Sequence, residues 1–499
     1  MLGTEEKNFE NMLILSGGKF FGFFLTFLIP FFLSRWLTIE DYGTYKQIIL
    51  LWMVFLQIQN LGMDLGLFYF VKTDPRNAPI FSLNVAAANL ATTLLTIGAL
   101  LFFSGQISNL LNNSQLATYI PYFCLVLLFS IPAQHFEHYL VSMDKIKWAF
   151  ILEGLHEISK SCIIIMGFLF YNSLKTVLLM LSLLYLIKLC ILICFNISLI
   201  KRHHINLSTG AAYLLKQVAY GFPLGIARII SAIIYFDKLI ISFMYSVVQF
   251  TVYSVGCFEI PFVHTVLNTI WELASLEMVV ARNTNDHQRL IALMRDTLRK
   301  IAILSIPIAL FCIVFGKEII IFIFSATYKN SVPYFRLFML TFVANAFDCE
   351  LLFRVCRENT VFLKIQVLNL LLTLLMMIFL GMIYGPLGAL AGKIIAASIS
   401  LIVMFKSVRR FLGVPLSEFL PWANIVWITL LCAFLSSSTY IFTTLAGMSG
   451  VLQLSFAATI YFVSVFLILS SFGIVSEMEK EYFKRKIIGL NIFAKQGIT

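Results

Sequence analysis

Three charged residues interrupt one apolar stretch of the chain. The segment "GIARIISAIIYFDKLIISF", residues 225–243, is apolar enough to cross a membrane but contains Arg228, Asp237 and Lys238. A charged side chain at the centre of a bilayer costs on the order of 3 kcal/mol, so it normally faces a cavity, a partner or a functional site. Charges at this position therefore favour contact with a polar or charged molecule inside the membrane.

The composition identifies the class of protein. Of the 499 residues, 60% are hydrophobic and only 12% are charged, and the mean hydropathy is +0.92. One soluble core of this length cannot hide so much apolar surface from water, so the sequence indicates an all-α, polytopic membrane protein. At about 20 residues per span, we predict about fourteen transmembrane helices, at roughly 11–36, 45–71, 79–104, 117–141, 148–171, 175–200, 215–245, 250–278, 298–325, 331–355, 361–384, 386–405, 421–445 and 450–473.

The distribution of Lys and Arg predicts the orientation. With both termini in the cytoplasm, most of these residues fall in cytoplasmic segments, whereas the opposite side receives only Arg35, Lys46, Lys175 and Lys329. This asymmetry follows the positive-inside rule. The net charge of +11 therefore reports topology and contact with anionic lipids, and gives no reason to expect a nucleic-acid partner.

A weak internal repeat divides the chain. A shift of 208 residues places "IEDYGTY" (39–45) on "VVQFTVY" (247–253), and "NLGMDL" (60–65) on "NTIWEL" (268–273). Six spans separate the two copies, so they would have the same orientation, as in transporters built from two parallel lobes with a site between them. We predict an N-terminal lobe at 1–210, a C-terminal lobe at 211–410, two additional spans at 411–475 and a basic cytoplasmic tail at 476–499.

The repeat brings two buried cations into correspondence. Arg228 lies near the middle of its span, and Lys19 in the first span is one position from its shifted equivalent. Lys238 is about 15 Å further along the same span as Arg228. These three cations are candidates to bind an anionic group. Asn60 and Asn268, which the repeat superposes, are candidates to meet polar parts of the same molecule.

Three carboxylates are candidates for ion coupling: Asp64, Glu272 and Asp237. Intramembrane carboxylates serve as proton or sodium sites in transporters. For Asp64 and Glu272 the alternative is a salt bridge to a cytoplasmic loop, and for Asp237 it is a structural partner on a neighbouring span.

A second cluster raises metal chemistry. "HFEH" (135–138) and "EGLHEISK" (153–160) place His and Glu at helical spacing, as in di-iron bundles. The required second motif is missing, and Glu157 and Lys160 stand at the spacing of a local ion pair. We therefore predict no metal and no cofactor. The nine cysteines lie almost wholly inside spans, where they act as small apolar residues.

Several motifs resemble a known transporter family. "FLSRWLTIEDYGTYKQI" (32–48) is similar to the first-hairpin signature of bacterial oligosaccharide flippases. "YGFPLG" and "DKLIIS" in the seventh span, "YSVGCFEIPF" in the eighth and "YGPLGALAGKIIA" before the twelfth are similar to Wzx-like polysaccharide transporters, including O-antigen flippases, of the multidrug/oligosaccharidyl-lipid/polysaccharide exporter superfamily.

The resemblance implies a function. It predicts a flippase in the bacterial cytoplasmic membrane that moves undecaprenyl-diphosphate-linked oligosaccharides to the outer leaflet by alternating access, for O-antigen, capsule or exopolysaccharide assembly. The implied partners are this lipid-linked substrate, membrane lipids and the glycan polymerase of the same pathway. A drug or cation antiporter of the same fold is one alternative. An integral-membrane glycan polymerase or ligase is another, although its usual large extracytoplasmic loop is missing, and we predict that the protein is not an enzyme.

Overall fold

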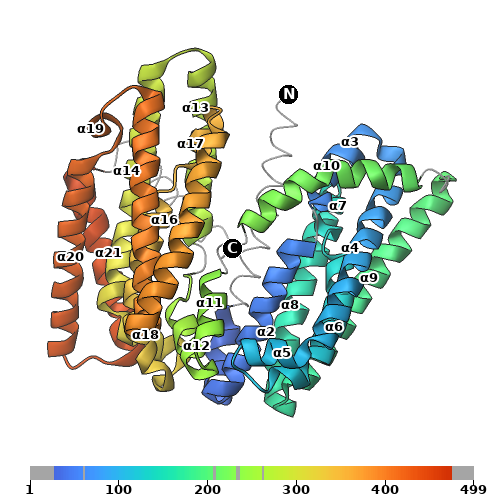
Figure 1. Cartoon of the computed structure of the whole chain (residues 1–499). Helices are drawn as coiled ribbons and strands as arrows, with labels where there is room; N and C mark the ends of the chain where they lie inside the picture. Colours follow the sequence, from blue (N-terminus) through green and yellow to red (C-terminus); the bar gives the residue numbers. More distant parts are fainter. Residues whose placement is uncertain (1–26, 60–61, 206–209, 232–235, 261–262, 475–499) are drawn as a thin grey trace, which may run out of the picture. The chain divides into compact units, whose positions relative to one another are not determined.

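The structure is a computed structural model that describes the chain except for residues 1–26, 60–61, 206–209, 232–235, 261–262 and 475–499. Every regular element in the described residues is a helix, which confirms the all-α prediction. Figure 1 shows these helices as two compact units, which we describe separately.

Seven described helices or helix pairs are long and apolar enough to cross a membrane. They begin at Pro75, Leu116, Leu174, His287, Asn359, Trp422 and Gly450. The helices Ile39–Gln59 and Met63–Thr73, bent by 44°, together make an eighth candidate. These findings confirm a multi-pass membrane protein, whereas the count of fourteen stays a prediction because several predicted spans consist of shorter helices.

The first unit comprises Met1–Val255, Ile323–Ser325 and Tyr384–Ala389. Its helices are α2 (Ile39–Gln59), α3 (Met63–Thr73), η1 (Pro75–Asn77), α4 (Ala78–Phe102), α5 (Ser104–Leu110), α6 (Leu116–Ala133), α7 (Phe136–Ser142), α8 (Ile146–Tyr171), α9 (Leu174–His203), α10 (Gly210–Ser231), α11 (Phe236–Met244) and α12 (Val247–Gly256), whose last residue belongs to the other unit. Helices α4, α6 and α9 pack side by side, and α8 packs against α9 (Figure 1).

The second unit comprises Gly256–Phe322, Ala326–Ile383 and Leu390–Thr499. Its helices are α13 (Val263–Asn283), α14 (His287–Val314), α15 (Gly316–Phe324), which ends in the first unit, η4 (Ala326–Ser331), α16 (Val332–Ala346), α17 (Glu350–Val355), α18 (Asn359–Leu412), α19 (Leu416–Phe419), α20 (Trp422–Leu445) and α21 (Gly450–Ser471). Helix α14 packs against α13, α16, α20 and α21, and the Tyr461 hydroxyl of α21 donates to the Pro307 carbonyl of α14 at 3.0 Å.

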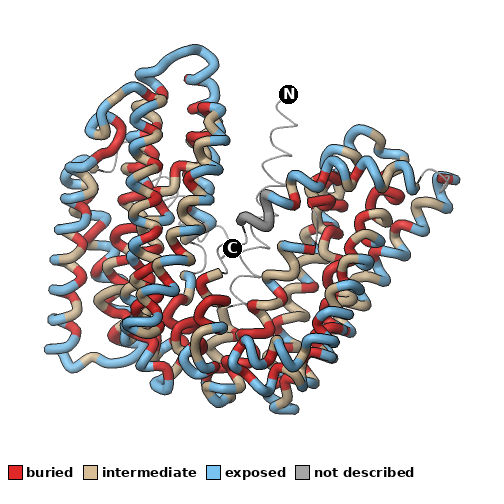
Figure 2. The backbone as a smooth tube through the Cα atoms, in the orientation of Figure 1, coloured by how far each residue is buried: buried red, intermediate tan, exposed pale blue. Residues whose placement is uncertain are grey.

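Burial within each unit follows helix faces. Figure 2 shows buried residues on the sides that neighbouring helices turn toward one another and exposed residues on the outward sides. Many exposed side chains are large and apolar, such as Leu95, Phe170 and Leu452. An outward apolar surface is the arrangement that a bilayer requires, since lipid rather than water surrounds it.

Helix α18 is a hairpin of two spans. Gly385 has φ +69° and ψ −161°, a conformation that glycine adopts without steric penalty, and Pro386 follows it. A Cβ added to Gly392 would lie 2.4 Å from the Met376 carbonyl oxygen. In a straight helix these two residues would be about 24 Å apart. The chain therefore folds back at Gly385, in agreement with the predicted boundary between spans 11 and 12.

The close approach at Gly392 gives a stability prediction. Gly392→Ala places a methyl group against the backbone of Met376 and Met377, which cannot move aside as a flexible side chain would. We expect a loss of about 1–3 kcal/mol, typical of overpacking. The measurement is the melting temperature of the detergent-solubilised protein. Gly98→Ala in α4 is the matched control, because its Cβ meets nothing within 4 Å and alanine favours helix. An unchanged melting temperature for Gly392→Ala would contradict the hairpin packing.

The local structure supports the internal repeat. The apolar helix Phe27–Trp36 ends 208 residues before the end of α11 at Met244, and α2 begins 208 residues before α12. A Cβ on Gly43 would lie 2.1 Å from the Thr251 hydroxyl oxygen, and Thr251 is the shifted equivalent of Gly43. Residues that the shift makes equivalent are thus neighbours, and the two related copies stay a prediction.

The boundary between the two compact units does not coincide with the boundary between the two predicted lobes. Helices α10 and α11 and nearly all of α12 belong to the first unit, whereas the predicted C-terminal lobe begins at residue 211. Side-chain contacts place α10 there: Gln217 donates to the Phe81 carbonyl at 3.1 Å and accepts from Asn84 at 3.0 Å. The predicted lobes describe related copies of sequence, and they stay a prediction.

Candidate functional site

The motif at residues 32–48 forms a turn between two helices. Thr38 precedes α2; its hydroxyl accepts from the Asp41 backbone N–H at 3.1 Å and donates to the Asp41 carboxylate at 2.7 Å. This exchange caps the helix, because it satisfies a backbone donor that has no partner within the helix. Arg35 lies over the Phe31 ring and donates to the Ile323 carbonyl at 3.0 Å. The motif therefore has a structural role, and it holds Ile323–Ser325 in the first unit.

The candidate anion-binding residues are only partly described. Lys19 and Asn60 lie outside the described residues, and Arg228 lies on α10 with a side chain that is not described. Lys238 is half-buried on α11. Their grouping around one ligand therefore stays a prediction.

Of three other predicted site residues, Asp237 is buried, whereas Asn268 and Glu272 are exposed. Asp237 is buried on α11 and accepts a hydrogen bond from the Tyr253 hydroxyl of α12 at 3.2 Å. This is the neighbouring-span partner that the sequence left open for Asp237. Asn268 and Glu272 are exposed on α13 in the second unit.

Asp64 belongs to a buried polar cluster in the first unit. Only 1% of its surface is exposed, and its carboxylate lies 3.2 Å from Nδ1 of His138 on α7. The sequence alternative for Asp64 was a salt bridge to a cytoplasmic loop. In the structure, its carboxylate instead lies next to a histidine of predicted span 4. His135 is fully buried one helical turn before His138, and its Nε2 lies 3.0 Å from the Ser82 hydroxyl.

This cluster continues into α9, where Asn196 donates to the Ser82 hydroxyl at 3.1 Å. A carboxylate, two imidazoles, a hydroxyl and an amide therefore lie close together in the core of the first unit. Since His138 retains 34% of its side-chain exposure, its ring touches both the buried carboxylate and the exterior. Such an arrangement is suited to moving or holding a proton.

The His and Glu motifs considered for a metal site lie at or next to α7 and on α8. No group of three or more His, Cys, Asp or Glu side chains in the described part of the chain is arranged to hold a metal ion. Glu153, one of the residues at di-iron spacing, instead pairs with Lys188 of the next helix at 2.7 Å.

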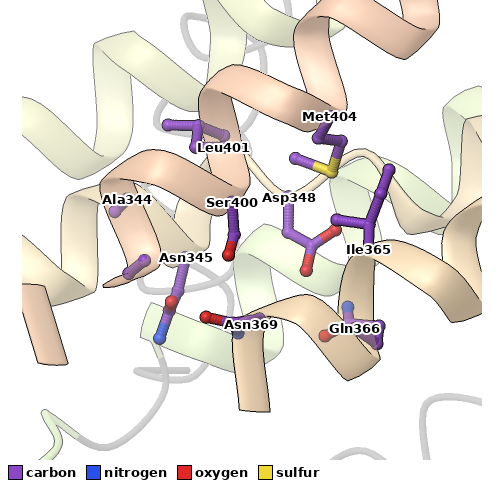
Figure 3. A pocket seen from close by; sticks show the side chains of 10 residues that line it. Ala344, Asn345, Asp348, Ile365, Gln366, Asn369, Ser400, Leu401 and Met404 are labelled. Carbon is purple, nitrogen blue, oxygen red and sulfur yellow. The ribbon is translucent and has the colours of Figure 1, made fainter. Parts of the chain in front are cut away.

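A small polar cavity of about 40 Å³ lies in the second unit, between α16, the residue Asp348 that follows it, and the two halves of α18. Figure 3 shows the Asp348 carboxylate, three side-chain amides and the Ser400 hydroxyl around it. The amides belong to Asn345, Gln366 and Asn369. Ser400 is 7% exposed, and its hydroxyl has no hydrogen-bond partner among the described residues. Oxygen-rich walls of this kind suit a sugar hydroxyl, water or a hard cation.

Comparison with known proteins places the chain in a family. The family model described as "Polysaccharide biosynthesis protein" matches residues 32–333, more than half of the chain. The chain belongs to this family. A search of curated proteins gave no match.

Solved structures show the fold of this polysaccharide biosynthesis protein. It is similar to "Lipid II flippase MurJ, inward closed conformation", with a TM-score of 0.64 and 13% identity over 92% of this chain and 99% of that one. It is also similar to an inward-facing multidrug resistance MATE family transporter of the MOP superfamily, with a TM-score of 0.63 and 13% identity over 78% of this chain and 94% of that one. The fold is therefore that of a MurJ-like or MATE-like transporter, which confirms the resemblance seen in the sequence.

Several polar groups of this protein were not predicted from the sequence. The Asp348 cavity combines residues from three predicted spans, and the Asp64 cluster combines α3, α4, α7 and α9. The available signal was local: Gln366 and Asn369 are polar residues three apart on an otherwise apolar span, which places them on one helix face.

Proposed function

We propose that this transporter flips undecaprenyl-diphosphate-linked oligosaccharide units from the cytoplasmic to the outer leaflet of the bacterial cytoplasmic membrane, by alternating access and with both termini cytoplasmic. The match of the polysaccharide biosynthesis family to residues 32–333 carries the proposal. The flippase-like fold supports it. The products are O-antigen, capsule or exopolysaccharide units, which a glycan polymerase of the same pathway then joins.

The chemistry of the cargo agrees with charges inside the spans. A diphosphate joined to a sugar must cross an apolar core in which an unpaired charge costs several kcal/mol. Lys19, Arg228 and Lys238 are the proposed counter-charges, and Asn60 and Asn268 the proposed partners of sugar hydroxyls. The protein catalyses no covalent step in this proposal, which is supported by a fold similar to that of a flippase and a transporter.

Ion coupling is a further part of the proposal. The buried Asp64, paired with His138, is the proposed proton site of the first unit. Glu272 is exposed and Asp237 is bonded to Tyr253, so these two are weaker candidates for the same role.

Deletion of the gene in its native host tests the function. We expect loss of one surface glycan and accumulation of its complete lipid-linked unit on the cytoplasmic side of the membrane. The measurement is mass spectrometry of extracted lipid-linked oligosaccharides, with accessibility to a glycosidase or a lectin to assign the leaflet. Complementation with the intact gene is the control.

Two other outcomes would assign a different function. Single flipped units accumulating outside would indicate a polymerase or ligase. An unchanged glycan together with new sensitivity to cationic drugs would indicate a drug or cation antiporter, the alternative that the buried carboxylates Asp64 and Asp237 favour.

A further inference from the structure

Four charged side chains lie within two membrane-spanning helices of the first unit. Glu157 and Lys160 lie near the centre of α8, which runs from Ile146 to Tyr171, and Glu153 lies seven residues from its start. Lys188 occupies the centre of α9, which runs from Leu174 to His203. At 1.5 Å per residue, Lys188 is about 21 Å from either end of its helix. Glu157, Lys160 and Lys188 are therefore deep in the membrane, whereas Glu153 lies about 10 Å from the start of α8.

The four charges form two ion pairs. Lys188 Nζ lies 2.7 Å from the Glu153 carboxylate and joins α9 to α8, while Lys160 Nζ lies 2.6 Å from the Glu157 carboxylate on the same helix. The lysines retain 13% and 19% of their side-chain exposure, and the glutamates 30% and 28%. Neither pair is fully buried in the first unit.

The charged side of α8 does not face lipid. The apolar residues Ile151 and Leu155 are 44% and 57% exposed and mark the outward side of the helix. At 100° per residue, Glu153 and Lys160 point roughly opposite to them. The aromatic neighbours agree, because Tyr185 of α9 packs on Trp52 of α2 at 5.4 Å. The cluster therefore faces the interior of the unit.

A buried polar atom beside the ion pairs has no partner. His156 lies on α8 between the two glutamates, is 7% exposed and packs edge-on against the Tyr185 ring at 4.7 Å. Its Nε2 makes no hydrogen bond within the described part of the chain. A buried polar group without a partner costs about 1–3 kcal/mol, so this nitrogen calls for a partner outside the described side chains, such as water or a bound ligand.

We propose that Lys160 and Lys188 form a second oxyanion-binding site, which holds the diphosphate of the cargo during its passage through the first unit. In the empty site, Glu153 and Glu157 serve as counter-ions that keep both ammonium groups charged inside the membrane. In the occupied site, phosphate oxygens replace the carboxylates as acceptors, and each released carboxylate takes up a proton, so that no unpaired charge is left inside the membrane. The inference rests on the proposed function, and it assigns the site to residues other than Lys19, Arg228 and Lys238.

The chemistry favours lysine for such a transient site. An ammonium group is a compact charge with three rotatable donors, whereas a guanidinium group binds a phosphate through a fixed, paired geometry. A carrier must release its cargo. An ammonium group that can bind either a glutamate carboxylate or a phosphate oxygen with similar strength lets the cargo leave an intermediate site.

Binding by neutralised variants of the full-length protein tests the site. The probe is farnesyl diphosphate, titrated into detergent-solubilised protein by isothermal calorimetry. Lys188→Gln removes a charge-assisted bond to the ligand, and we expect affinity to fall about tenfold. Glu153→Gln removes the competing carboxylate, and we expect affinity to rise about tenfold because Lys188 is then free for the ligand. Asp144→Asn is the matched control, since it breaks the exposed Lys72–Asp144 pair of similar length, 2.6 Å.

The double variant Glu153→Gln/Lys188→Gln separates binding from stability. We expect it to keep a melting temperature close to that of the unmodified protein, because neither partner is left as an unpaired charge, and to bind farnesyl diphosphate as weakly as Lys188→Gln. A purely structural pair would lower the melting temperature in both single variants and leave the affinity unchanged in all of them, and this result would overturn the proposal.

Two more arms identify the anion. Inorganic diphosphate is expected to compete with farnesyl diphosphate, and glucuronate, which represents an acidic sugar, is expected not to compete at the same concentration. Competition by glucuronate alone would overturn the assignment to the diphosphate. The deletion experiment reports separately on flipping. Accumulated lipid-linked units with unchanged affinities would refute this site alone, whereas altered affinities without accumulation would refute the proposed function.

Discussion

Arg228→Ala is expected to abolish accumulation of the surface glycan in complemented deletion cells while the amount of protein in the membrane stays normal. Arg228 lies on α10, which the first unit holds through Gln217, and a guanidinium grips a phosphate through two parallel bonds. Charge-assisted bonds are worth about 1.5–3 kcal/mol each, so loss of two predicts a transport rate lower by about a hundredfold or more. The measurement is the rate of surface glycan appearance after induction.

Two further variants make this result specific. Arg228→Lys retains the charge without the paired geometry, so we expect it to keep part of the activity. Lys216→Ala on the same helix is the matched control, because Lys216 is exposed and lies over the Tyr213 ring at 5.9 Å. Full activity of both Arg228→Ala and Arg228→Lys would remove Arg228 from the binding site.

Hydropathy and charge were sufficient to predict the class of fold. Apolar length specifies a membrane helix because the bilayer thickness is fixed, and Gly385 followed by Pro386 marked the turn that divides α18. The turn motif at residues 38–41 was also readable, since Thr38 and Asp41 stand at capping distance. Each of these features depends on residues that are close in sequence.

Contacts between helices were not readable in the same way. At helical spacing Glu153 has Glu157 as its neighbour, yet its partner is Lys188, 35 residues later on α9. Likewise, the spacing of His135 and His138 suggested part of a metal motif, but His138 pairs with Asp64 of α3. One sequence shows which residues share a helix face, whereas the neighbour of that face depends on how the helices pack, and packing is set by the whole apolar surface.

The cavity at Asp348 illustrates the same limit. Its polar residues are spaced over three predicted spans, and each span alone shows only one or two of them in an apolar run. The hairpin of α18 brings Gln366 and Asn369 opposite Ser400, as Figure 3 shows. The sequence predicted the hairpin but did not indicate which faces of its two halves meet, and so the site was missed.

The buried pair Asp64–His138 leads to the second large effect, on coupling. Asp64→Asn is expected to slow glycan export on the order of tenfold, the effect of about 1.4 kcal/mol, and to remove its dependence on external pH. Asp64 is buried beside the partly exposed His138 ring, and intramembrane carboxylates serve as proton sites in transporters. In the unmodified protein, export should therefore rise as the external pH is lowered from 8 to 6, since inward proton movement would drive it.

Asparagine has the size of aspartate and carries no charge, so the core around Met63 and Leu67 should pack as before. Export rates of complemented cells at external pH 6, 7 and 8 measure the effect, and the melting temperature of purified protein reports on the fold. Asp144→Asn, at an exposed carboxylate, is the control and should leave both unchanged. His138→Gln should also flatten the pH profile, because it removes the group through which Asp64 exchanges its proton. A slope that survives in Asp64→Asn would mean that the pair is structural and that coupling, if present, uses another site such as Asp348.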